Sequence, residues 1–422
     1  MAPAAESGTV AVPGAVSAPA PAPDTGQVAA LRWDIFCRVI DNHGDLGVCW
    51  RLSVDLAERG HQVRLWVDDA RALAWMAPGG HAGVHVLPWS ESPLTGLDAP
   101  GDVAIEAFGC ELPLSYQAAL AHQAQPDPTA PTTASPLTPG PAHRPAVWIN
   151  LEYLSAEAFV DRSHGLPSPV MSGPARGLTK WFFYPGFTAR TGGLIREPHR
   201  WPPRLWADQA QRPPPAPAPA PAPASPSSQE SATEPPTSRR HRALRVSLFC
   251  YEPPGLEGWL QGLGQGPIPI HLWVAAGRPQ AAVRRCLPDG HRHGSRLNLR
   301  ALPFLTQVRY DDLLRHCDLN VVRGEDSLVR AIWAGRPLIW HIYPQADGAH
   351  HDKLEAFLAM SQAPATLADY HRRWNADQAL PLPDLTWNLL AAWQNWALAL
   401  RDRLVGQADL TTQLVDFVAG KR

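Results

Sequence analysis

The chain has 422 residues, with 37 basic and 39 acidic side chains and a formal net charge of −2. This length is sufficient for two ordinary domains, and the balanced charge argues against nucleic acid or a membrane surface as a partner held by bulk electrostatic attraction. No run of roughly 18 apolar residues occurs, so no membrane-spanning helix is expected.

The six cysteines and the N-terminal residues bear on the cellular compartment. No two cysteines are spaced as CxxC and most lie in apolar runs, which is typical of buried free thiols rather than of a disulfide framework or a zinc site. The N-terminal segment lacks a basic start, and prolines interrupt its apolar run, so it is a poor signal peptide. We expect a cytoplasmic, soluble protein.

Three segments rich in proline are expected to be disordered, namely residues 1–30, 122–145 and 207–243. Such tracts bury too little apolar surface to offset the entropy lost on ordering. We expect a tail and two surface inserts without a catalytic part. For 207–243, we expect a spacer rather than a site for a polyproline-binding partner.

Between these segments, short apolar runs alternate with helical patterns. In the first half, strands are predicted at 33–40, 62–67, 103–107, 146–150 and 180–184, with helices at 46–59 and 111–121. In the second half, strands are predicted at 244–250, 270–275, 297–302, 317–322 and 337–342, with helices at 325–335, 352–360 and 386–404. This alternation is typical of parallel sheets covered on both faces, and it predicts the α/β class.

Two such series predict two doubly wound, Rossmann-like domains facing across a cleft. The expected divisions are a tail at 1–30, a first domain at 31–200, a Pro-rich linker at 201–243, a second domain at 244–385 and C-terminal helices at 386–422. Ligands of such sheets bind at the carboxyl ends of the strands. The polar motifs that follow predicted strands are therefore the candidate sites.

The motif DNHGDLG, residues 41–47, follows the first predicted strand. Gly44 permits a tight turn and close approach of the backbone to a ligand. Asp41 and Asp45 are candidates for a base and its partner, because neighbouring carboxylates push each other's pKa values apart. Asp45 also stands where a helix N-cap is expected, so the pattern alone leaves capping open. The G-x-G-x-x-G fingerprint of dinucleotide binding is absent here.

The motif RGEDS, residues 323–327, has the same strand, turn and helix setting. Backbone N–H groups at a helix N-terminus, together with Arg323, make a natural diphosphate site, and Ser327 can donate one more hydrogen bond. The acidic pair at 325–326 would repel phosphate, so it is expected to face sugar hydroxyls, a cationic acceptor or the helix cap. A capped helix with a surface salt bridge is the open alternative.

Three further groups of residues are weaker candidates. Phe304 and Gln307 could stack on and hydrogen-bond a nucleobase, and Tyr251 could reach a phosphate or sugar. The acidic pair at 311–312 resembles half a metal site, but the following residues indicate a helix. The histidines of 341–351 lack acid or cysteine partners at ligand spacing, so no metal is expected.

Seven stretches of the chain resemble, in the same order, those of the bacterial protein-arginine rhamnosyltransferase family (EarP). The resemblance extends from about residue 32 to about residue 400 and is interrupted by the Pro-rich inserts. The stretches are WDIFCRVIDNHGDLGVCWRL, IEAFGCELP, WINLEYLSAE, FFYPGFTARTGGLIRE, SLFCYE, CDLNVVRGEDSLVRAIWAG and PLIWHIYPQ.

The resemblance implies a GT-B glycosyltransferase that needs no metal or other cofactor. The donor would be dTDP-β-L-rhamnose, bound mainly by the second domain. The sugar would pass, with inversion, to an arginine of translation elongation factor P. The alternatives are a GT-B enzyme with another nucleotide sugar or acceptor, and a non-enzymatic binding protein, which the presence of the essential carboxylates disfavours.

Carried onto this chain, the essential carboxylates of the family match Asp41, Asp45 and Glu325. The donor site comprises the matched contacts together with His43 and Gly324, and His43 stands where the family usually has Phe or Tyr. The matched donor contacts are Asn42, Gly44, Tyr251, Phe304, Gln307, Arg323, Asp326 and Ser327.

The chemistry of guanidinium gives these residues expected roles. Guanidinium has a pKa of about 13 and a delocalised lone pair, so it is a poor nucleophile. Asp45 is expected to act as the base, with Asp41 orienting the guanidinium, although these two roles could be exchanged. Glu325 would hold the acceptor or stabilise the oxocarbenium-like sugar, and Arg323 would neutralise the departing dTDP.

Overall fold

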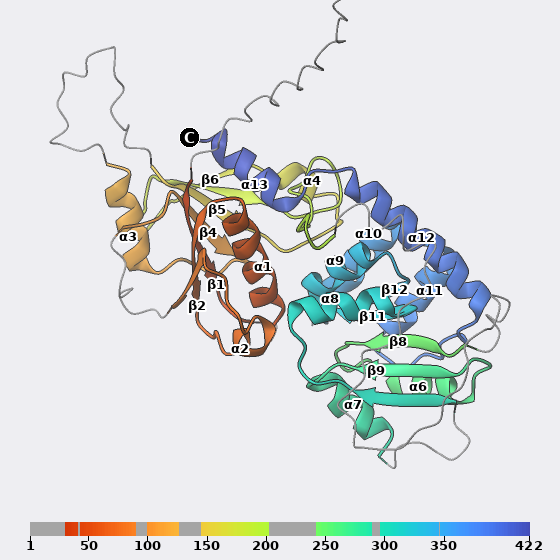
Figure 1. Cartoon of the computed structure of the whole chain (residues 1–422). Helices are drawn as coiled ribbons and strands as arrows, with labels where there is room; N and C mark the ends of the chain where they lie inside the picture. Colours follow the sequence, from red (N-terminus) through yellow and green to blue (C-terminus); the bar gives the residue numbers. More distant parts are fainter. Residues whose placement is uncertain are drawn as a thin grey trace, which may run out of the picture. The chain divides into compact units, whose positions relative to one another are not determined.

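The computed structural model describes residues 30–40, 43–89, 99–125, 145–201, 242–288, 296–345 and 347–422. Residues Leu31–Arg422 form one compact unit. This unit contains two sheets (Figure 1). The predicted disorder of the Pro-rich segments falls almost entirely outside the described residues. At the edge of the first insert, however, residues 122–123 complete a helix.

The first half is a seven-stranded sheet of order β3-β2-β1-β4-β5-β7-β6 among the described residues. All of its strand pairs are parallel except the antiparallel pair of β6 and β7. Its strands are β1 (Arg32–Cys37), β2 (Gln62–Val67), β3 (Val84–Pro88), β4 (Val103–Ala107), β5 (Val147–Leu151), β6 (Pro167–Pro169) and β7 (Thr179–Phe183). Its helices are α1 (Gly44–Glu58), α2 (Leu73–Met76), α3 (Leu114–Gln123) and α4 (Val160–Ser163).

The second half is a five-stranded, fully parallel sheet of order β10-β9-β8-β11-β12. Its strands are β8 (Leu244–Leu248), β9 (Ile270–Val274), β10 (Leu297–Ala301), β11 (Leu319–Arg323) and β12 (Leu338–His341). The helices that follow β8 in sequence are α6 (Leu256–Gln265), α7 (Arg278–Cys286), α8 (Gln307–His316), α9 (Gly324–Ala334), α10 (Ala349–Ser361), α11 (Ala365–Trp374), α12 (Trp387–Val405) and α13 (Leu410–Ala419).

The predicted parallel α/β architecture is confirmed, and burial explains it. Every residue of β4, β5 and β11 is buried, as expected for central strands covered on both faces. The first predicted strand is shorter than expected, because it ends at Cys37 and residues 38–40 lead into a loop. The predicted free thiols are also confirmed: all six cysteines are unpaired, and five of them are buried.

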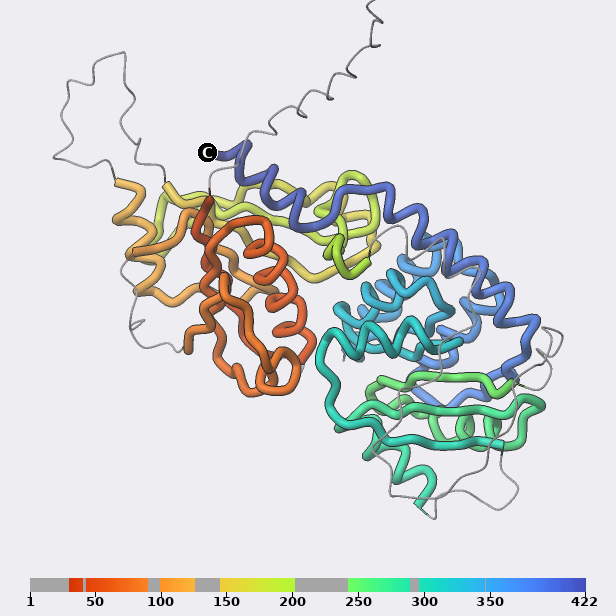
Figure 2. Tube along the Cα trace, in the orientation of Figure 1, coloured from red at the N-terminus to blue at the C-terminus, as the bar shows by residue number. Residues whose placement is uncertain are grey.

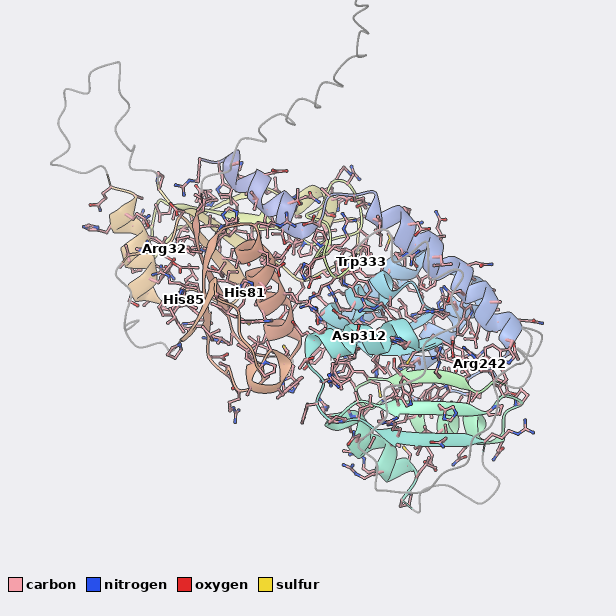
Figure 3. The ribbon with its side chains drawn as sticks, viewed as in Figure 1. Arg32, His81, His85, Arg242, Asp312 and Trp333 are labelled. Carbon is pink, nitrogen blue, oxygen red and sulfur yellow. The ribbon has the colours of Figure 1, made fainter. Side chains whose placement is uncertain are left out.

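The C-terminal helices connect the two halves, as the blue segment in Figures 1 and 2 shows. In α12, Trp393 and Leu400 belong to the apolar core of the second half. In α13, Leu414 and Val418 belong to the core of the first half. Trp333 of α9, labelled in Figure 3, donates its indole N–H to the carbonyl of Ile195 (2.7 Å). The halves are therefore joined by shared packing as well as by the chain.

Among the described residues, no helix has both the length and the apolar character needed to cross a membrane.

Candidate active site

Two strand-to-helix turns, one from each half, meet at the candidate site. In the first half β1 leads through a loop to α1, and in the second half β11 leads directly to α9. Gly324 begins α9 with a φ of +67°, a left-handed conformation that favours glycine. Helices α1 and α9 pack against each other. The two glycine motifs that the sequence singled out are therefore brought together.

The larger cavity at this junction has a volume of about 250 Å³. Its walls come from α1 and α2 of the first half and from the residues that follow β8, β9, β10 and β11 in the second half. It is lined by His43, Gly44, Arg51, Trp75, Met76, Phe249, Ala275, Ala276, Gly277, Arg278, Pro303, Phe304, Leu305, Gln307, Tyr310, Arg323, Gly324, Glu325, Asp326 and Ser327.

A second cavity of about 210 Å³ adjoins the first. Gly44, Gly324 and Glu325 line both cavities, so the two spaces meet at these residues. The other walls of the second cavity belong to α1, β12 and α10 or follow β1, β4, β5 and β12. They are Ile40, Asp45, Val48, Phe108, Tyr153, Trp340, Ile342, Tyr343, Gln345 and Lys353.

Arg323 forms a cationic wall of the larger cavity. Its side chain is buried, and its Nη1 atom has no hydrogen-bond partner among the described residues. The guanidinium lies 4.6 Å from the ring centroids of both Phe249 and Tyr251. Helix α9 begins immediately after Arg323, its N-cap residue, which makes no side-chain capping hydrogen bond. A free guanidinium N–H beside a helix N-terminus is well suited to an anionic ligand.

Tyr251, a predicted donor contact, is not among the residues that line the two cavities. It is almost completely buried, its N–H donates to His341 Nδ1 (3.2 Å), and its ring packs against Arg323. The aromatic residue of this strand end that lines the cavity is Phe249, which the sequence did not single out.

Aromatic rings form the opposite wall of the larger cavity. Phe304 is half exposed, and its ring centroid lies 4.8 Å from that of Trp75. His43 packs edge-on against Trp75 at 5.1 Å. The imidazole of His43 is thus part of the aromatic wall. Trp75 lies 28 residues after the end of the first motif, so no local pattern identified it.

Gln307 and Asp326 line the larger cavity but already have protein partners. The amide nitrogen of Gln307 donates to the carbonyl of Gly47 (3.0 Å). The Asp326 carboxylate lies 2.9 Å from Nε of Arg51. Ser327 is buried in the first turn of α9 and also lines the cavity.

Asp45 does not cap α1, which decides the alternative that the sequence left open. The N-cap residue is His43, whose side chain makes no capping hydrogen bond. Asp45 instead accepts a hydrogen bond at Oδ2 from the backbone N–H of Ile40 (2.9 Å), across the loop that leads into the helix. It is buried and lines the second cavity. Asp41 and Asn42 lie outside the described residues.

Glu325 is held from both halves. Its Oε1 atom lies 2.8 Å from Nζ of Lys353, and its Oε2 atom accepts a hydrogen bond from the backbone N–H of Leu154 (2.7 Å). Burial raises the pKa of Glu325, Lys353 opposes this rise, and the nearby charge of Asp45 adds to it. The two predicted carboxylates are therefore close enough to influence each other. Lys353 was not predicted from the sequence.

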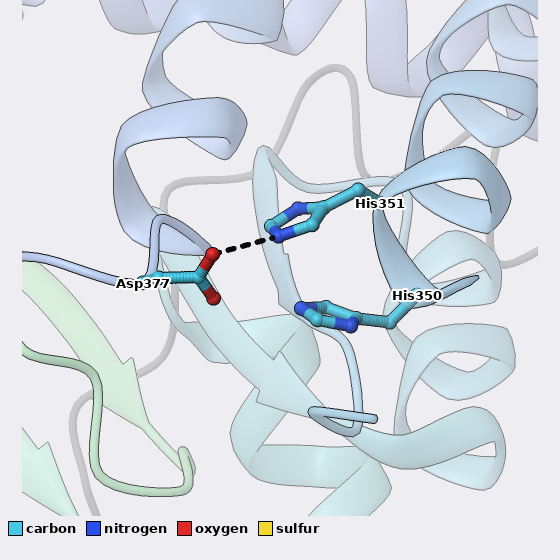
Figure 4. Close-up of side chains that lie close together, drawn as sticks. All are labelled: His350, His351 and Asp377. Carbon is cyan, nitrogen blue, oxygen red and sulfur yellow. Dashed lines mark ion pairs between the residues drawn. The ribbon is translucent and has the colours of Figure 1, made fainter. Parts of the chain in front are cut away.

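A histidine cluster lies near the second cavity, and the sequence spacing did not reveal its acidic member. Ligand atoms of His350, His351 and Asp377 lie within 4.8 Å of one another (Figure 4). Nδ1 of His350, however, accepts the backbone N–H of Gln345 (3.2 Å), which places the proton of the neutral ring on Nε2. Coordination through either nitrogen of His350 would break that hydrogen bond or require loss of that proton.

The acidic residues Asp311 and Asp312 both pair with arginine side chains. Asp311 is buried and pairs through both oxygens with Arg51 and Arg330. Asp312, labelled in Figure 3, pairs with Arg315 one turn further along α8. The two aspartates are adjacent in the sequence but have different partners in the structure.

The fold and these cavities together define a class of enzyme. Two parallel α/β halves present the carboxyl ends of their strands to a pair of adjoining cavities, one of which has a cationic wall. With the C-terminal helices joining the halves, this is the architecture of a GT-B glycosyltransferase.

The chain belongs to the EarP family, whose model, described as "Elongation-Factor P (EF-P) rhamnosyltransferase EarP", matches residues 33–419. It is 41% identical over 413 residues to a protein-arginine rhamnosyltransferase of Pseudomonas putida, covering 91% of this chain and 98% of the relative. It is 40% identical over 416 residues to that of Pseudomonas aeruginosa, covering 92% and 98%.

A solved structure is also similar, with a TM-score of 0.53 and 28% identity. The likeness covers 92% of this chain and 99% of the other. That structure is described as "Structural basis for EarP-mediated arginine glycosylation of translation elongation factor EF-P".

Proposed function

We propose that this glycosyltransferase transfers L-rhamnose from dTDP-β-L-rhamnose to an arginine side chain of translation elongation factor P, with inversion at the anomeric carbon. The family and the names of the relatives support the sugar, the arginine and the acceptor protein. The observation that carries the proposal is the junction of two cavities at Gly44, Gly324 and Glu325. A donor in one cavity and an acceptor side chain in the other would meet there.

The donor occupies the larger cavity. Its diphosphate lies against Arg323 and the N-terminus of α9, which supply positive charge to the leaving group. The thymine lies toward the aromatic wall of Phe304, Trp75 and His43. Because protein groups supply this positive charge, no metal ion is required for departure of dTDP. The amide of Gln307 and the hydroxyl of Ser327 complete the polar contacts.

The acceptor arginine enters the second cavity. Phe108 and Tyr153 form its aromatic side, with ring centroids 4.8 Å apart and an interplanar angle of 22°. Aromatic faces attract guanidinium. Asp45 lies in the same cavity, where it acts as the base that removes a guanidinium proton while the C–N bond forms. Asp41 orients the guanidinium.

Glu325 acts at the junction of the two cavities. Its carboxylate is fixed by Lys353 and by the N–H of Leu154, so it is preorganised rather than free to swing. A negative charge held there stabilises the positive charge that develops on the sugar as dTDP departs.

Peptide mapping by tandem mass spectrometry tests this proposal. Elongation factor P is incubated with the protein and dTDP-β-L-rhamnose, and one added deoxyhexose is expected on an arginine residue. Addition to another residue type, or no addition with dTDP-β-L-rhamnose, would contradict the proposed reaction. Transfer from UDP- or GDP-sugars, with thermal stabilisation by UDP or GDP but not by dTDP, would assign a different donor to the same fold.

A further inference from the structure

We propose that Arg51 is a positioning residue, which sets the placement of the acceptor half relative to the donor half by pairing across the interface with Asp326 and Asp311. This inference rests on the proposed function, because it concerns the junction at which donor and acceptor meet. Arg51 belongs to α1, which also carries Gly44 and Asp45. Asp326 belongs to α9, which also carries Gly324 and Glu325.

All three guanidinium nitrogens of Arg51 contact carboxylates of the protein. Its Nε atom lies 2.9 Å from Oδ1 of Asp326. Its Nη1 atom donates to Asp311 Oδ2 (3.2 Å) and to Glu197 Oε1 (3.3 Å), and its Nη2 atom donates to Asp311 Oδ1 (3.1 Å). Its Nη1 and Nη2 atoms make hydrogen bonds, whereas Nε is in ion-pair contact with Asp326 without a hydrogen bond. The charge of Arg51 is therefore matched by protein carboxylates, although the residue lines the donor cavity.

Arg330 braces the same carboxylates from the other side. It donates through Nε and Nη2 to Asp311 (3.0 and 2.8 Å) and through Nη1 to Glu197. Arg51, Glu197, Asp311 and Arg330 have exposed fractions of 0–3%. Although burial alone would raise it, the two arginines lower the pKa of Glu197 to about 2. The network is therefore charged and inaccessible to water, and it joins segments far apart in the chain.

A buried ion network of this kind is better suited to specifying an arrangement than to adding stability. Desolvation offsets much of the attraction, whereas removal of one partner leaves an uncompensated buried charge. Here the arrangement that is specified is the alignment of two helix N-termini. The bond from Gln307 to the carbonyl of Gly47 crosses the same interface one turn before Arg51. Removal of Arg51 should let α1, and Asp45 with it, move relative to Glu325.

The matched control is Arg59, at the other end of α1. It pairs with Asp55 (3.0 Å) and with Asp409 beside α13 (2.7 Å), and it donates to Thr412 (2.7 Å). It thus also loses ion pairs on substitution to glutamine, but it lies outside both cavities. If the loss of transfer activity followed only from reduced stability, Arg59→Gln would lose activity as well.

The first measurement separates binding from turnover in Arg51→Gln, Arg51→Lys and Arg59→Gln. For Arg51→Gln we expect nearly unchanged dTDP affinity by calorimetry but an approximately 100-fold lower kcat, the effect of a misplacement of about 1 Å. Arg51→Lys keeps one charge but cannot span the three carboxylates, so it should fold and show a smaller loss. Arg59→Gln should keep the wild-type kcat. Equal kcat in all three variants would overturn the proposal. So would a loss of dTDP affinity that accounts for the whole loss of transfer activity in Arg51→Gln.

The second measurement does not depend on activity. Nitroxide labels at Arg176→Cys in the first half and Arg300→Cys in the second, both exposed, report the distance between the halves by pulsed electron paramagnetic resonance. A Cys286→Ser background removes the one native cysteine that is not buried. We expect a broader or shifted distance distribution in Arg51→Gln and the wild-type distribution in Arg59→Gln. Identical distributions would overturn the positioning role even if transfer activity were confirmed, and a shift in a protein without that activity would reject only the proposed function.

Discussion

The ammonium of Lys353 lies 2.8 Å from the carboxylate of Glu325, and both side chains line the cavity that holds Asp45. Lys353 belongs to α10 and Glu325 to α9, while the second oxygen of Glu325 is bound by the backbone of Leu154 in the first half. The pair therefore fixes a negative charge at the point where the two cavities join, and its strength should control how that charge depends on pH.

Substitution of Lys353 by glutamine should shift the pH dependence of the reaction. Burial raises the pKa of Glu325 and Lys353 lowers it, so loss of the ammonium raises this pKa further. If the ionised carboxylate is the active form, the acidic limb of kcat/KM moves to higher pH. Lys353→Arg keeps the charge and should move the limb much less. An unchanged limb in Lys353→Gln would exclude Glu325 as the group that sets it.

Lys353→Gln should also change how the stability of the protein depends on pH. Because the pKa of Glu325 is raised in the folded state, its contribution is present below the unfolded pKa and is lost as the pH rises through the folded pKa. Loss of Lys353 removes the partner of the ionised form only. The difference in Tm between wild type and Lys353→Gln should therefore be small at acidic pH and grow toward neutral pH in thermal unfolding.

Arg323→Gln should weaken donor binding. Hydrogen bonds to a charged group contribute about 1.5–3 kcal/mol, so the Kd for dTDP measured by calorimetry should rise by roughly 10- to 150-fold. Arg278 lines the same cavity but is exposed and lies near Glu252, so Arg278→Gln is the control and should have a much smaller effect. Equal Kd values for the two variants would argue against Arg323 as the diphosphate ligand.

His43→Phe should keep donor affinity, whereas His43→Ala should reduce it. The imidazole packs edge-on against Trp75 at 5.1 Å, and aromatic pairs of this kind contribute about 0.5–1.5 kcal/mol. The expected rise in the dTDP Kd of His43→Ala is therefore roughly 2- to 12-fold. A Phe variant as weak as the Ala variant would indicate that a polar atom of His43, rather than its ring, contacts the donor.

Tyr153→Ala should raise the KM for the acceptor protein without changing the Kd for dTDP. A cation–π contact contributes about 0.5–2 kcal/mol, which corresponds to roughly 2- to 30-fold in KM. Tyr153→Phe keeps the ring that stacks on Phe108 and should resemble wild type. Phe159→Ala, which removes a similarly exposed aromatic residue away from both cavities, is the control. A change in dTDP affinity instead of acceptor KM would place Tyr153 in the donor site.

The features that could be predicted from the sequence are those determined by neighbouring residues. Predominantly apolar runs such as VAIEA (103–107) and LNVVR (319–323) are buried central strands. The glycine turns at Gly44 and Gly324 begin α1 and α9. They lie at the carboxyl ends of strands, where ligands of parallel sheets bind. Helix α6, with the sequence LEGWLQGLGQ, was missed because its glycines lower helix propensity, although Trp259 and Leu263 pack it into the core.

The features that could not be predicted depend on contacts between distant segments. The partners of Glu325 are Leu154, 171 residues away, and Lys353, 28 residues away. Asp311 stood beside Asp312 in an acidic pair, but its partner Arg51 is 260 residues away. Asp45 stood where an N-cap is expected, and the Ile40 N–H that it binds belongs to a loop. Periodicity and spacing carry no information on such pairs.

The measurement that tests the proposed function most directly is the intact mass of elongation factor P after incubation with dTDP-β-L-rhamnose and either wild type or Asp45→Asn. Wild type should add the mass of one deoxyhexose. Asp45→Asn should bind dTDP normally but react at least about 100-fold more slowly, as expected when a general base is lost. Addition of the sugar at the wild-type rate by Asp45→Asn would contradict the role of Asp45, and no addition by wild type under saturating dTDP-β-L-rhamnose would contradict the reaction itself.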